Sequence, residues 1–437
     1  MKLSNELKNI KTYPFHMPGH KRNASYNIPA GDIDITEIAG FDNLHNPEEV
    51  LKNMEYEISD LFKSKRSIIS VNGSTCGILS AISAVSNKGD KIIIARNCHK
   101  SVYNACFINE LDVYYIEPEF NNEFAIYTSI SQQSIDRAVN KNPDACAVVI
   151  TSPTYEGFVS RINCSIPLII DSAHGAHFGF ADFLPQRAEA DIVVQSLHKT
   201  LPSLTQTAVV HINNENFTEK VKMYMDIYET SSPSYVLLSS VDRCVDFLKN
   251  CNHDFADFKK RLNNFYSEIE KLSYIRILKN DDISRIVLAC DGLSGVEFAQ
   301  ILRDKYLIEV EGATLNYIIL ISTVCDTENG FNMLLNALKN IEHSESRCIY
   351  NTKTTIPKKH FKSSDIKETV LLKLPESAEK ICAEYVYAYP PGIPIIVPGE
   401  EISGEMINLI YEMHKCGVNL ISDSNSLPES ILTKREQ

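Results

Sequence analysis

Short, uninterrupted apolar runs alternate along the first half of the chain with longer segments whose apolar residues recur every three or four positions. Uninterrupted runs are typical of strands buried on both faces, and the longer period indicates helices. The runs predict strands at Ser67–Val71, Lys91–Ala95, Val113–Ile116, Ala145–Thr151, Leu168–Asp171, Ile192–Ser196 and Val209–Ile212. The periodic segments predict helices at 47–63, Gly77–Val85, Ser101–Ile108 and Ser131–Val139. This alternation predicts an α/β fold with a mostly parallel sheet.

The pattern changes in the second half of the chain. Residues 232–272 carry helical periodicity without strand signals. A smaller α+β unit is predicted from strands at Ser284–Cys290, Ile308–Val310 and Tyr317–Ile321 and helices at Gly295–Lys305 and Asn329–Ile341. The tail predicts a strand at Val370–Leu372, a helix near 376–383, a loop at Tyr389–Glu400 and a helix at 402–415. We therefore expect an N-terminal arm (1–40), a large domain (41–275), a small α+β domain (280–342), and a connector with a C-terminal domain (343–437).

Composition narrows the function classes. The formal net charge is −13, which argues against a nucleic-acid partner because binding phosphates needs clustered Lys and Arg. The 12 cysteines form no C-x-x-C pair and several lie in apolar runs, which favours free thiols in a reducing compartment. No apolar run reaches transmembrane length, and the N-terminus has no apolar signal core. We expect a cytoplasmic protein with no membrane partner.

The first segment that could bind a ligand lies between a predicted strand and a predicted helix. Its sequence is Ser70-Val71-Asn72-Gly73-Ser74-Thr75-Cys76-Gly77. Backbone N–H groups at a helix N-terminus favour an anion, and Ser74 and Thr75 add hydroxyl donors. The segment suits one phosphate group, although a plain helix cap after a tight turn remains open. It is not a Walker A loop, since no Gly-Lys-Ser/Thr follows.

A second segment, Leu168–His177, ends an apolar strand in Asp171. Ligands of open α/β sheets bind beyond the carboxyl ends of strands, where a carboxylate could keep a cofactor's ring nitrogen protonated. Two alternatives remain open: Asp171, His174 and His177 could ligate a metal, or Asp171 could cap a helix beside packed histidines.

Two further segments follow strands. Ser196-Leu197-His198-Lys199-Thr200 could present Lys199 as an amine nucleophile, with Ser196 and His198 as phosphate donors. His99, in Arg96-Asn97-Cys98-His99-Lys100-Ser101, could stack on an aromatic cofactor ring. The alternatives are an ordinary loop lysine and a histidine at a helix start. Together the four segments supply what pyridoxal phosphate needs at one sheet edge.

The order of these segments resembles the ornithine/lysine/arginine decarboxylases of pyridoxal-phosphate fold type I. Further stretches of the chain also match that family: Phe15-His16-Met17-Pro18-Gly19-His20-Lys21, Asp34–Glu37, Asp42–His45, Ser231-Ser232-Pro233-Ser234-Tyr235 and Tyr389–Glu400. The resemblance covers nearly the whole chain, with 270–380 matching only in general pattern. It implies a compact member without the N-terminal wing domain, active on arginine, lysine or ornithine, and linked to polyamine synthesis.

The resemblance implies roles for individual residues. Lys199 bonds to the cofactor, Asp171 pairs with its ring nitrogen, His99 stacks on the ring, and Lys199 or His198 returns a proton. The phosphate and the rest of the cofactor are held by Gly73, Ser74, Thr75, Ala173, His174, Ser196 and His198. Ser232 and Ser234 lie near the cofactor of this subunit or of the partner subunit, since fold type I sites form at the interface of a homodimer. Substrate contacts are expected from Glu400 and His20, although Glu400 could equally be an acid near a helix N-terminus.

Two departures from the family pattern stand out. Ser172 occupies a position where the family usually has Glu, and the segment Phe158–Pro167 is shorter than usual. Two other functions therefore stay open: another fold type I reaction, such as transamination or elimination, and a pyridoxal-phosphate-binding homologue without activity. We rank arginine slightly above lysine as substrate, and we expect no metal.

Overall fold

The computed structural model describes residues 2–10, 17–18, 21–22, 24–344, 349–353, 355–389 and 392–435. They form two compact units. The first unit comprises Met1–Val85 and Pro167–Ala256, and the second comprises Ser86–Ile166 and Asp257–Gln437. The domain boundaries expected from the sequence stay predictions.

The first unit contains four strands in the order β1 (Arg66–Ser70), β9 (Ala208–Ile212), β8 (Ile192–Ser196) and β7 (Leu168–Asp171). β7 and β8 are parallel, and β9 is antiparallel to both β8 and β1, so β1 runs in the direction of β8. Ser70 and Ser196 pair with the same residue, Ala208, from opposite sides. The carboxyl ends of β1, β7 and β8 therefore meet at one edge.

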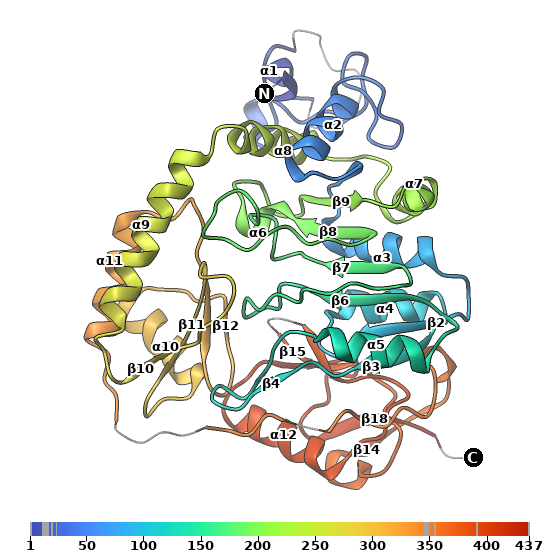
Figure 1. The fold of residues 1–437 in the computed structure, drawn as a ribbon, viewed down its shortest axis with the longest axis vertical. Helices are drawn as coiled ribbons and strands as arrows, with labels where there is room; N and C mark the ends of the chain where they lie inside the picture. Colours follow the sequence, from blue (N-terminus) through green and yellow to red (C-terminus); the bar gives the residue numbers. More distant parts are fainter. Residues whose placement is uncertain are drawn as a thin grey trace. The chain divides into compact units, whose positions relative to one another are not determined.

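The first unit also contains helices, some of which pack against these strands (Figure 1). They are α1 (Lys2–Lys8), α2 (Val50–Phe62), α3 (Gly73–Val85), α6 (Leu197–Thr200), α7 (Thr218–Tyr228) and α8 (Tyr235–Leu248), with 3₁₀ turns at Ala24–Tyr26 and Glu215–Phe217. α3 lies very close to the sheet, because a Cβ added at Gly77 would come within 2.7 Å of Val210 and 2.8 Å of Val194. Only glycine allows this approach.

The second unit contains a parallel set of strands in the order β6 (Ala145–Thr151), β2 (Lys91–Ala95) and β3 (Asp112–Ile116). It also holds the helices α4 (Lys100–Ile108) and α5 (Gln132–Lys141) and the short hairpin of β4 (Phe120–Asn121) and β5 (Ile126–Tyr127). α9 (Asn252–Ile269) begins in the first unit and continues in the second.

Two smaller α+β assemblies complete the second unit. The first is an antiparallel sheet of β10 (Ile275–Ile277), β11 (Arg285–Cys290), β13 (Ile318–Ile321) and β12 (Gly312–Ala313), with α10 (Gly295–Tyr306) and α11 (Glu328–Lys339). The second holds α12 (Gly404–Lys415), 3₁₀ turns at Ser363–Asp365 and Leu374–Ser377, and two small sheets (Figure 1). Those sheets pair β14 (Thr369–Lys373) with β18 (Ser430–Lys434), and β15 (Val386–Ala388) with β16 (Ile393–Ile396) and β17 (Leu420–Ser422).

The predicted strands and helices of the first half are confirmed, with ends that differ by a few residues. Three predictions in the second half are wrong. Ile308–Val310 is not a strand, because α10 ends in a left-handed cap at Leu307 and pairing starts at Gly312. Residues 376–383 form no α-helix beyond the turn at Leu374–Ser377, since Ile381 and Cys382 pair across to Glu401 and Thr433. The supposed loop at Tyr389–Glu400 contains β16.

No described helix is long and apolar enough to cross a membrane. The described cysteines are free thiols and most are buried, as the cysteine pattern suggested.

Candidate active site at the carboxyl edge of β1, β7 and β8

Lys199 and Asp171 follow adjacent parallel strands of the first unit. Asp171 ends β7, and Lys199 lies in the single turn α6 directly after β8. The Asp171 side chain is almost fully buried and accepts a hydrogen bond from the N–H of Ala173 at 3.1 Å. Burial raises the pKa of Asp171, while the positive charge of Lys199 opposes the shift. The two predicted key residues therefore lie at one edge and interact electrostatically.

The ε-amine of Lys199 is half-buried and has a defined partner. Its Nζ donates to Nε2 of His174 at 3.0 Å, and His174 is itself buried. The metal alternative of Asp171, His174 and His177 gains no support, because among the described residues no three His, Cys, Asp or Glu side chains could hold a metal ion together.

His198 lies on the same turn as Lys199 and is partly buried. Its Nδ1 lies 2.9 Å from the carbonyl oxygen of Thr207, so this nitrogen carries the proton and donates it. Burial lowers the pKa of His198, and the nearby charge of Lys199 lowers it further. The imidazole is thus neutral near pH 7, with the lone pair on Nε2. Nε2 of His198 can donate a hydrogen bond to a phosphate only after the imidazole binds a second proton.

The first turn of α3 has the features of an anion site. Gly73, at a φ of +76°, begins the helix, and its own N–H is bonded to the carbonyl of Gln206. The N–H groups of Ser74 and Thr75 precede the first intrahelical hydrogen bonds, and no acidic residue occupies the first turn. Within the part of the chain that the structure describes, nothing lies within 4 Å of a Cβ placed on Gly73. The loop therefore leaves room for a ligand.

A buried carboxylate that the sequence did not single out supports this loop. Glu229 accepts hydrogen bonds from the N–H of Val71 at 2.6 Å and from the hydroxyl of Ser70 at 3.0 Å. His45 contacts residues before and after Glu229 in the chain: its Nδ1 lies 2.9 Å from Oδ1 of Asp226, and its Nε2 lies 2.7 Å from the carbonyl oxygen of Thr230. His45 belongs to the Asp42–His45 stretch that resembled the family, so this stretch holds the segment that carries Glu229.

The residues of the first unit fit a pyridoxal phosphate. The Ser196 hydroxyl is fully buried and has no hydrogen-bond partner within the described part of the chain, as expected of a donor that waits for a ligand. Ser196 and Ser70 pair with Ala208 from opposite sides. The Ser196 hydroxyl and the start of α3, which follows Ser70, therefore lie at the same edge of the sheet. A buried acid, a phosphate cradle and an accessible amine thus converge on one edge.

The structure gives two other predicted residues, Ser234 and His99, roles as helix caps. Ser234 caps α8 and accepts from the N–H of Leu237, while Ser232 is exposed in the preceding loop of the same unit. His99 belongs to the second unit, where it caps α4 by accepting from the N–H of Ser101. Its stacking on a cofactor stays a prediction. His20 lies outside the described residues.

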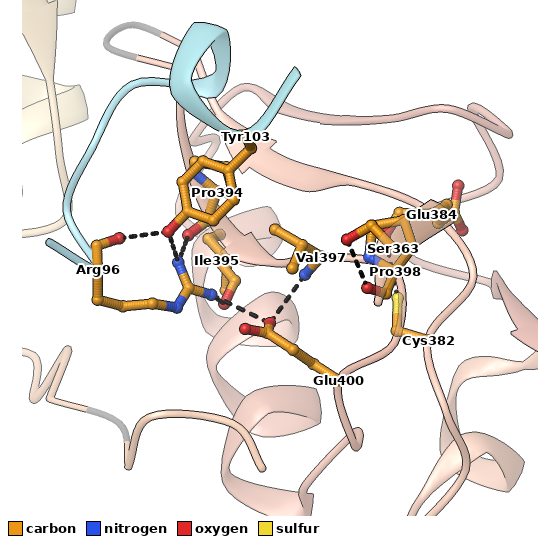
Figure 2. A network of polar contacts seen from close by, with 10 residues as sticks. All are labelled: Arg96, Tyr103, Ser363, Cys382, Glu384, Pro394, Ile395, Val397, Pro398 and Glu400. Carbon is orange, nitrogen blue, oxygen red and sulfur yellow. Dashed lines mark hydrogen bonds and ion pairs between the residues drawn. The ribbon is translucent and has the colours of Figure 1, made fainter. Parts of the chain in front are cut away.

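Glu400 has a clear structural partner (Figure 2). Its carboxylate is fully buried, lies 3.2 Å from Nη2 of Arg96 and accepts from the N–H of Val397 at 2.9 Å. Arg96 also donates to the carbonyls of Pro394 at 2.7 Å and Ile395 at 2.9 Å. The Glu400 carboxylate is thus engaged within the protein, and its expected contact with substrate stays a prediction.

Arg96 was passed over in the sequence, although a signal existed. An arginine directly after a continuous apolar strand is buried, and a buried arginine needs a partner. Its guanidinium also donates to Tyr103 at 3.0 Å and lies over the rings of Tyr103 and Tyr115. Arg96 therefore ties the β2–α4 segment, which carries His99, to the loop of β16.

Solved structures show which class this fold belongs to. A lysine decarboxylase of Francisella novicida superposes with a TM-score of 0.82 at 18% identity, covering 99% of this chain and 80% of that one. An SPT structure with PLP superposes with a TM-score of 0.53 at 14% identity, covering 66% and 75%. The fold is that of the fold type I pyridoxal-phosphate enzymes, as predicted.

Sequence comparison identifies the family. The profile "Orn/Lys/Arg decarboxylase, major domain" matches residues 3–289, and "Orn/Lys/Arg decarboxylase, C-terminal domain" matches 344–417. The arginine decarboxylase of Bacillus subtilis (strain 168) is 30% identical over 97% of this chain and 95% of its own length. The chain belongs to the Orn/Lys/Arg decarboxylase family, and it is a decarboxylase of basic amino acids.

Proposed function

We propose that this chain decarboxylates arginine in preference to lysine or ornithine, with pyridoxal 5'-phosphate bonded to Lys199. The main support is that Asp171 ends β7 and Lys199 follows the neighbouring parallel strand β8. The two residues are close enough for the positive charge of Lys199 to lower the pKa of Asp171. The preference for arginine is supported by the B. subtilis relative named arginine decarboxylase, whereas a lysine decarboxylase of Escherichia coli matches only 55% of the chain.

Residues of the first unit would hold the cofactor. The N–H groups and hydroxyls of Ser74 and Thr75 would bind the phosphate together with the buried hydroxyl of Ser196. The carboxylate of Asp171 would pair with the ring nitrogen, a contact that would offset the unfavourable burial of that acid. When bound, pyridoxal phosphate supplies an electron sink for the pair left behind as the α-carboxylate departs as CO₂.

The protonation states of His198 and Lys199 decide which of them we assign as the donor of the proton to Cα. Nδ1 of His198 is bonded to Thr207, and its pKa is lowered by burial, so Nε2 offers a lone pair rather than a proton. Lys199 carries protons on Nζ, within hydrogen-bond distance of Nε2 of His174. We therefore assign delivery of the proton to Cα to Lys199, with His174 as the neighbouring group that orients Nζ. A homodimer and a cytoplasmic location are part of the same proposal.

The test uses the purified protein loaded with pyridoxal phosphate. Borohydride should fix the cofactor on the peptide that contains Lys199, and Lys199→Ala should release no CO₂ above background. Lys91→Ala is the control, because Lys91 is paired with Asp144 in the second unit and lies outside the proposed site. CO₂ release measured with arginine, lysine and ornithine ranks the substrates, and recovery of a keto acid instead of an amine would refute decarboxylation.

A further inference from the structure

Four polar side chains form a continuous chain of hydrogen bonds along the sheet of the first unit. Ser64 Oγ lies 2.8 Å from Ser67 Oγ, which lies 2.9 Å from Nδ1 of His211. Nε2 of His211 lies 3.0 Å from Oε1 of Gln195, whose Nε2 donates to the carbonyl of Gly175 at 3.1 Å. These bonds lead from the loop before β1 across β9 and β8 to the turn after β7, and β9, β8 and β7 lie side by side (Figure 1).

The hydrogen bonds of this chain all point the same way. The carbonyl of Gly175 can only accept, so the amide nitrogen of Gln195 faces it and the amide oxygen faces His211. Nε2 of His211 therefore carries the proton. Burial lowers the pKa of His211 from 6.5 to about 3, so the imidazole is neutral and its Nδ1 accepts from the hydroxyl of Ser67. Ser67 in turn accepts from Ser64, which is half-buried.

The inner members of the chain are costly to bury. Gln195, His211 and Ser67 are 2%, 4% and 4% exposed, and burying such groups is unfavourable unless they are bonded. The valines that precede Gln195 and His211 face α3, so the two polar side chains lie on the other face of the sheet. There Phe62 stacks on the imidazole, with 4.7 Å between the ring centroids. A buried network that is bonded from end to end holds its parts in one arrangement.

The turn at the end of the chain is held by β8 at both of its ends. The N–H of Gly175 closes the turn on the carbonyl of Ser172 at 2.8 Å. Two main-chain hydrogen bonds from β8 hold the first two residues of the turn. The carbonyl of Gly175, at the far end, accepts from the N–H of Phe178 and from the amide of Gln195, both at 3.1 Å. Gln195 is thus the side chain through which β8 holds the far end of the turn.

This turn carries polar groups of the candidate active site. His174 lies inside it, with Nε2 at 3.0 Å from Nζ of Lys199. Asp171 directly precedes the turn and accepts from the N–H of Ala173 within it, at 3.1 Å. The main chain on both sides of His174 is therefore fixed by bonds to β8, and the direction in which its imidazole meets Lys199 depends on them.

We propose that Gln195 and His211 are positioning residues for the reaction, because they hold the turn that presents His174 to Lys199. Gln195 supplies the donor to the carbonyl of Gly175. His211 keeps that donor in place, since an amide of Gln195 turned by half a rotation would set its N–H groups against Nε2–H and its oxygen against the carbonyl. The inference rests on the proposed role of Lys199 and adds the residues that act on it from behind the sheet.

The first test measures the tautomer of His211 in the cofactor-loaded protein with nitrogen-15 in its histidines. The signals of His211 are identified by their loss in His211→Phe, which keeps a ring against Phe62, or in His211→Gln. Nuclear magnetic resonance at neutral pH should show a proton on Nε2 that exchanges slowly with water and a bare Nδ1. A proton on Nδ1 instead, or a charged imidazole, would overturn the direction of the chain and with it the inference.

The second test measures CO₂ release from arginine. Gln195→Met removes the donor but keeps a side chain of similar shape, and kcat should fall by about tenfold, the upper range for one neutral hydrogen bond. The KM should change by less than about twofold, since the turn acts on Lys199 and not on the substrate. His211→Phe leaves the donor in place but unsupported, so a loss of roughly threefold in kcat is expected. Ser4→Ala is the control, because it removes a buried hydrogen bond to Asp242 elsewhere in the first unit and should leave kcat unchanged.

A double-mutant cycle separates positioning from a general loss of structure. If Gln195 acts through His174, Gln195→Met should change kcat by less than about twofold in a His174→Phe background, whereas independent effects multiply. The inference fails if the two effects multiply, if the KM rises as kcat falls, or if Gln195→Met behaves like Ser4→Ala. Thermal unfolding checks the fold of each variant, and His211→Phe replaces Gln195→Met in the cycle if the latter does not fold. Full CO₂ release by Lys199→Ala would instead refute the proposed function, and the tautomer of His211 would still test the chain of bonds.

Discussion

Removal of the Glu400 carboxylate is expected to destabilise the protein strongly. Arg96 is only 10% exposed in its side chain and Glu400 is 0% exposed, with 3.2 Å between Nη2 and Oε2. Glu400→Ala leaves a buried guanidinium without its carboxylate partner and the N–H of Val397 without an acceptor. Such losses cost about 3–5 kcal/mol in the free energy of unfolding, a large share of a typical domain's stability.

Matched variants separate the contributions. Glu400→Gln keeps an acceptor for Val397 and should cost less than Glu400→Ala. Glu401→Ala is the control, because Glu401 pairs with His360 with both side chains about one-third exposed, and such a pair contributes about 0–1 kcal/mol. Arg96→Met combined with Glu400→Ala should cost less than the sum of the two single changes, because no unpaired charge remains.

Urea unfolding followed by far-UV circular dichroism measures these free energies, since the chain has no tryptophan to report by fluorescence. The KM for arginine is measured in parallel. Equal stability of Glu400→Ala and Glu401→Ala would refute the structural role of the pair. If the KM also rose tenfold, Glu400 would instead meet the substrate, as the sequence suggested.

Three further outcomes are expected. Gly77→Ala should cost about 1–3 kcal/mol and weaken cofactor binding, measured by urea unfolding and absorbance titration, because the new Cβ would press α3 away from Val194 and Val210. Asp171→Asn should weaken cofactor affinity by about tenfold or more in the same titration, since a charge-assisted hydrogen bond becomes a neutral one. Burial raises the pKa of Glu55 to about 7 from 4.5, so its contribution to stability is full below pH 4.5 and is lost as the pH rises through 7. In Glu55→Gln that loss should disappear. The free energy of unfolding of the variant should therefore rise relative to that of the wild type by about 1.4 kcal/mol per pH unit across this window. Urea titrations at several pH values measure the difference.

The sequence by itself located the candidate active site. Apolar runs predicted to end at Val71, Asp171 and Ser196 marked three strand ends, within one residue of the observed ends, and parallel strands place such ends at one edge. In the structure Ser70 and Ser196 both pair with Ala208 of the antiparallel strand β9, which lies between β1 and β8. Local patterns sufficed to propose this site because Ser74, Asp171 and Lys199 each lie within a few positions of the strand that places them.

Only the tertiary structure decided the partners of residues distant in sequence. Arg96 and Glu400 are 304 positions apart, and neither local pattern revealed the other. The apolar residues Ile381 and Cys382 were compatible with a helix until neighbouring segments offered them bridge pairs. Periodicity reports what a segment buries, whereas the choice of a polar partner depends on which segments the fold brings within hydrogen-bond distance.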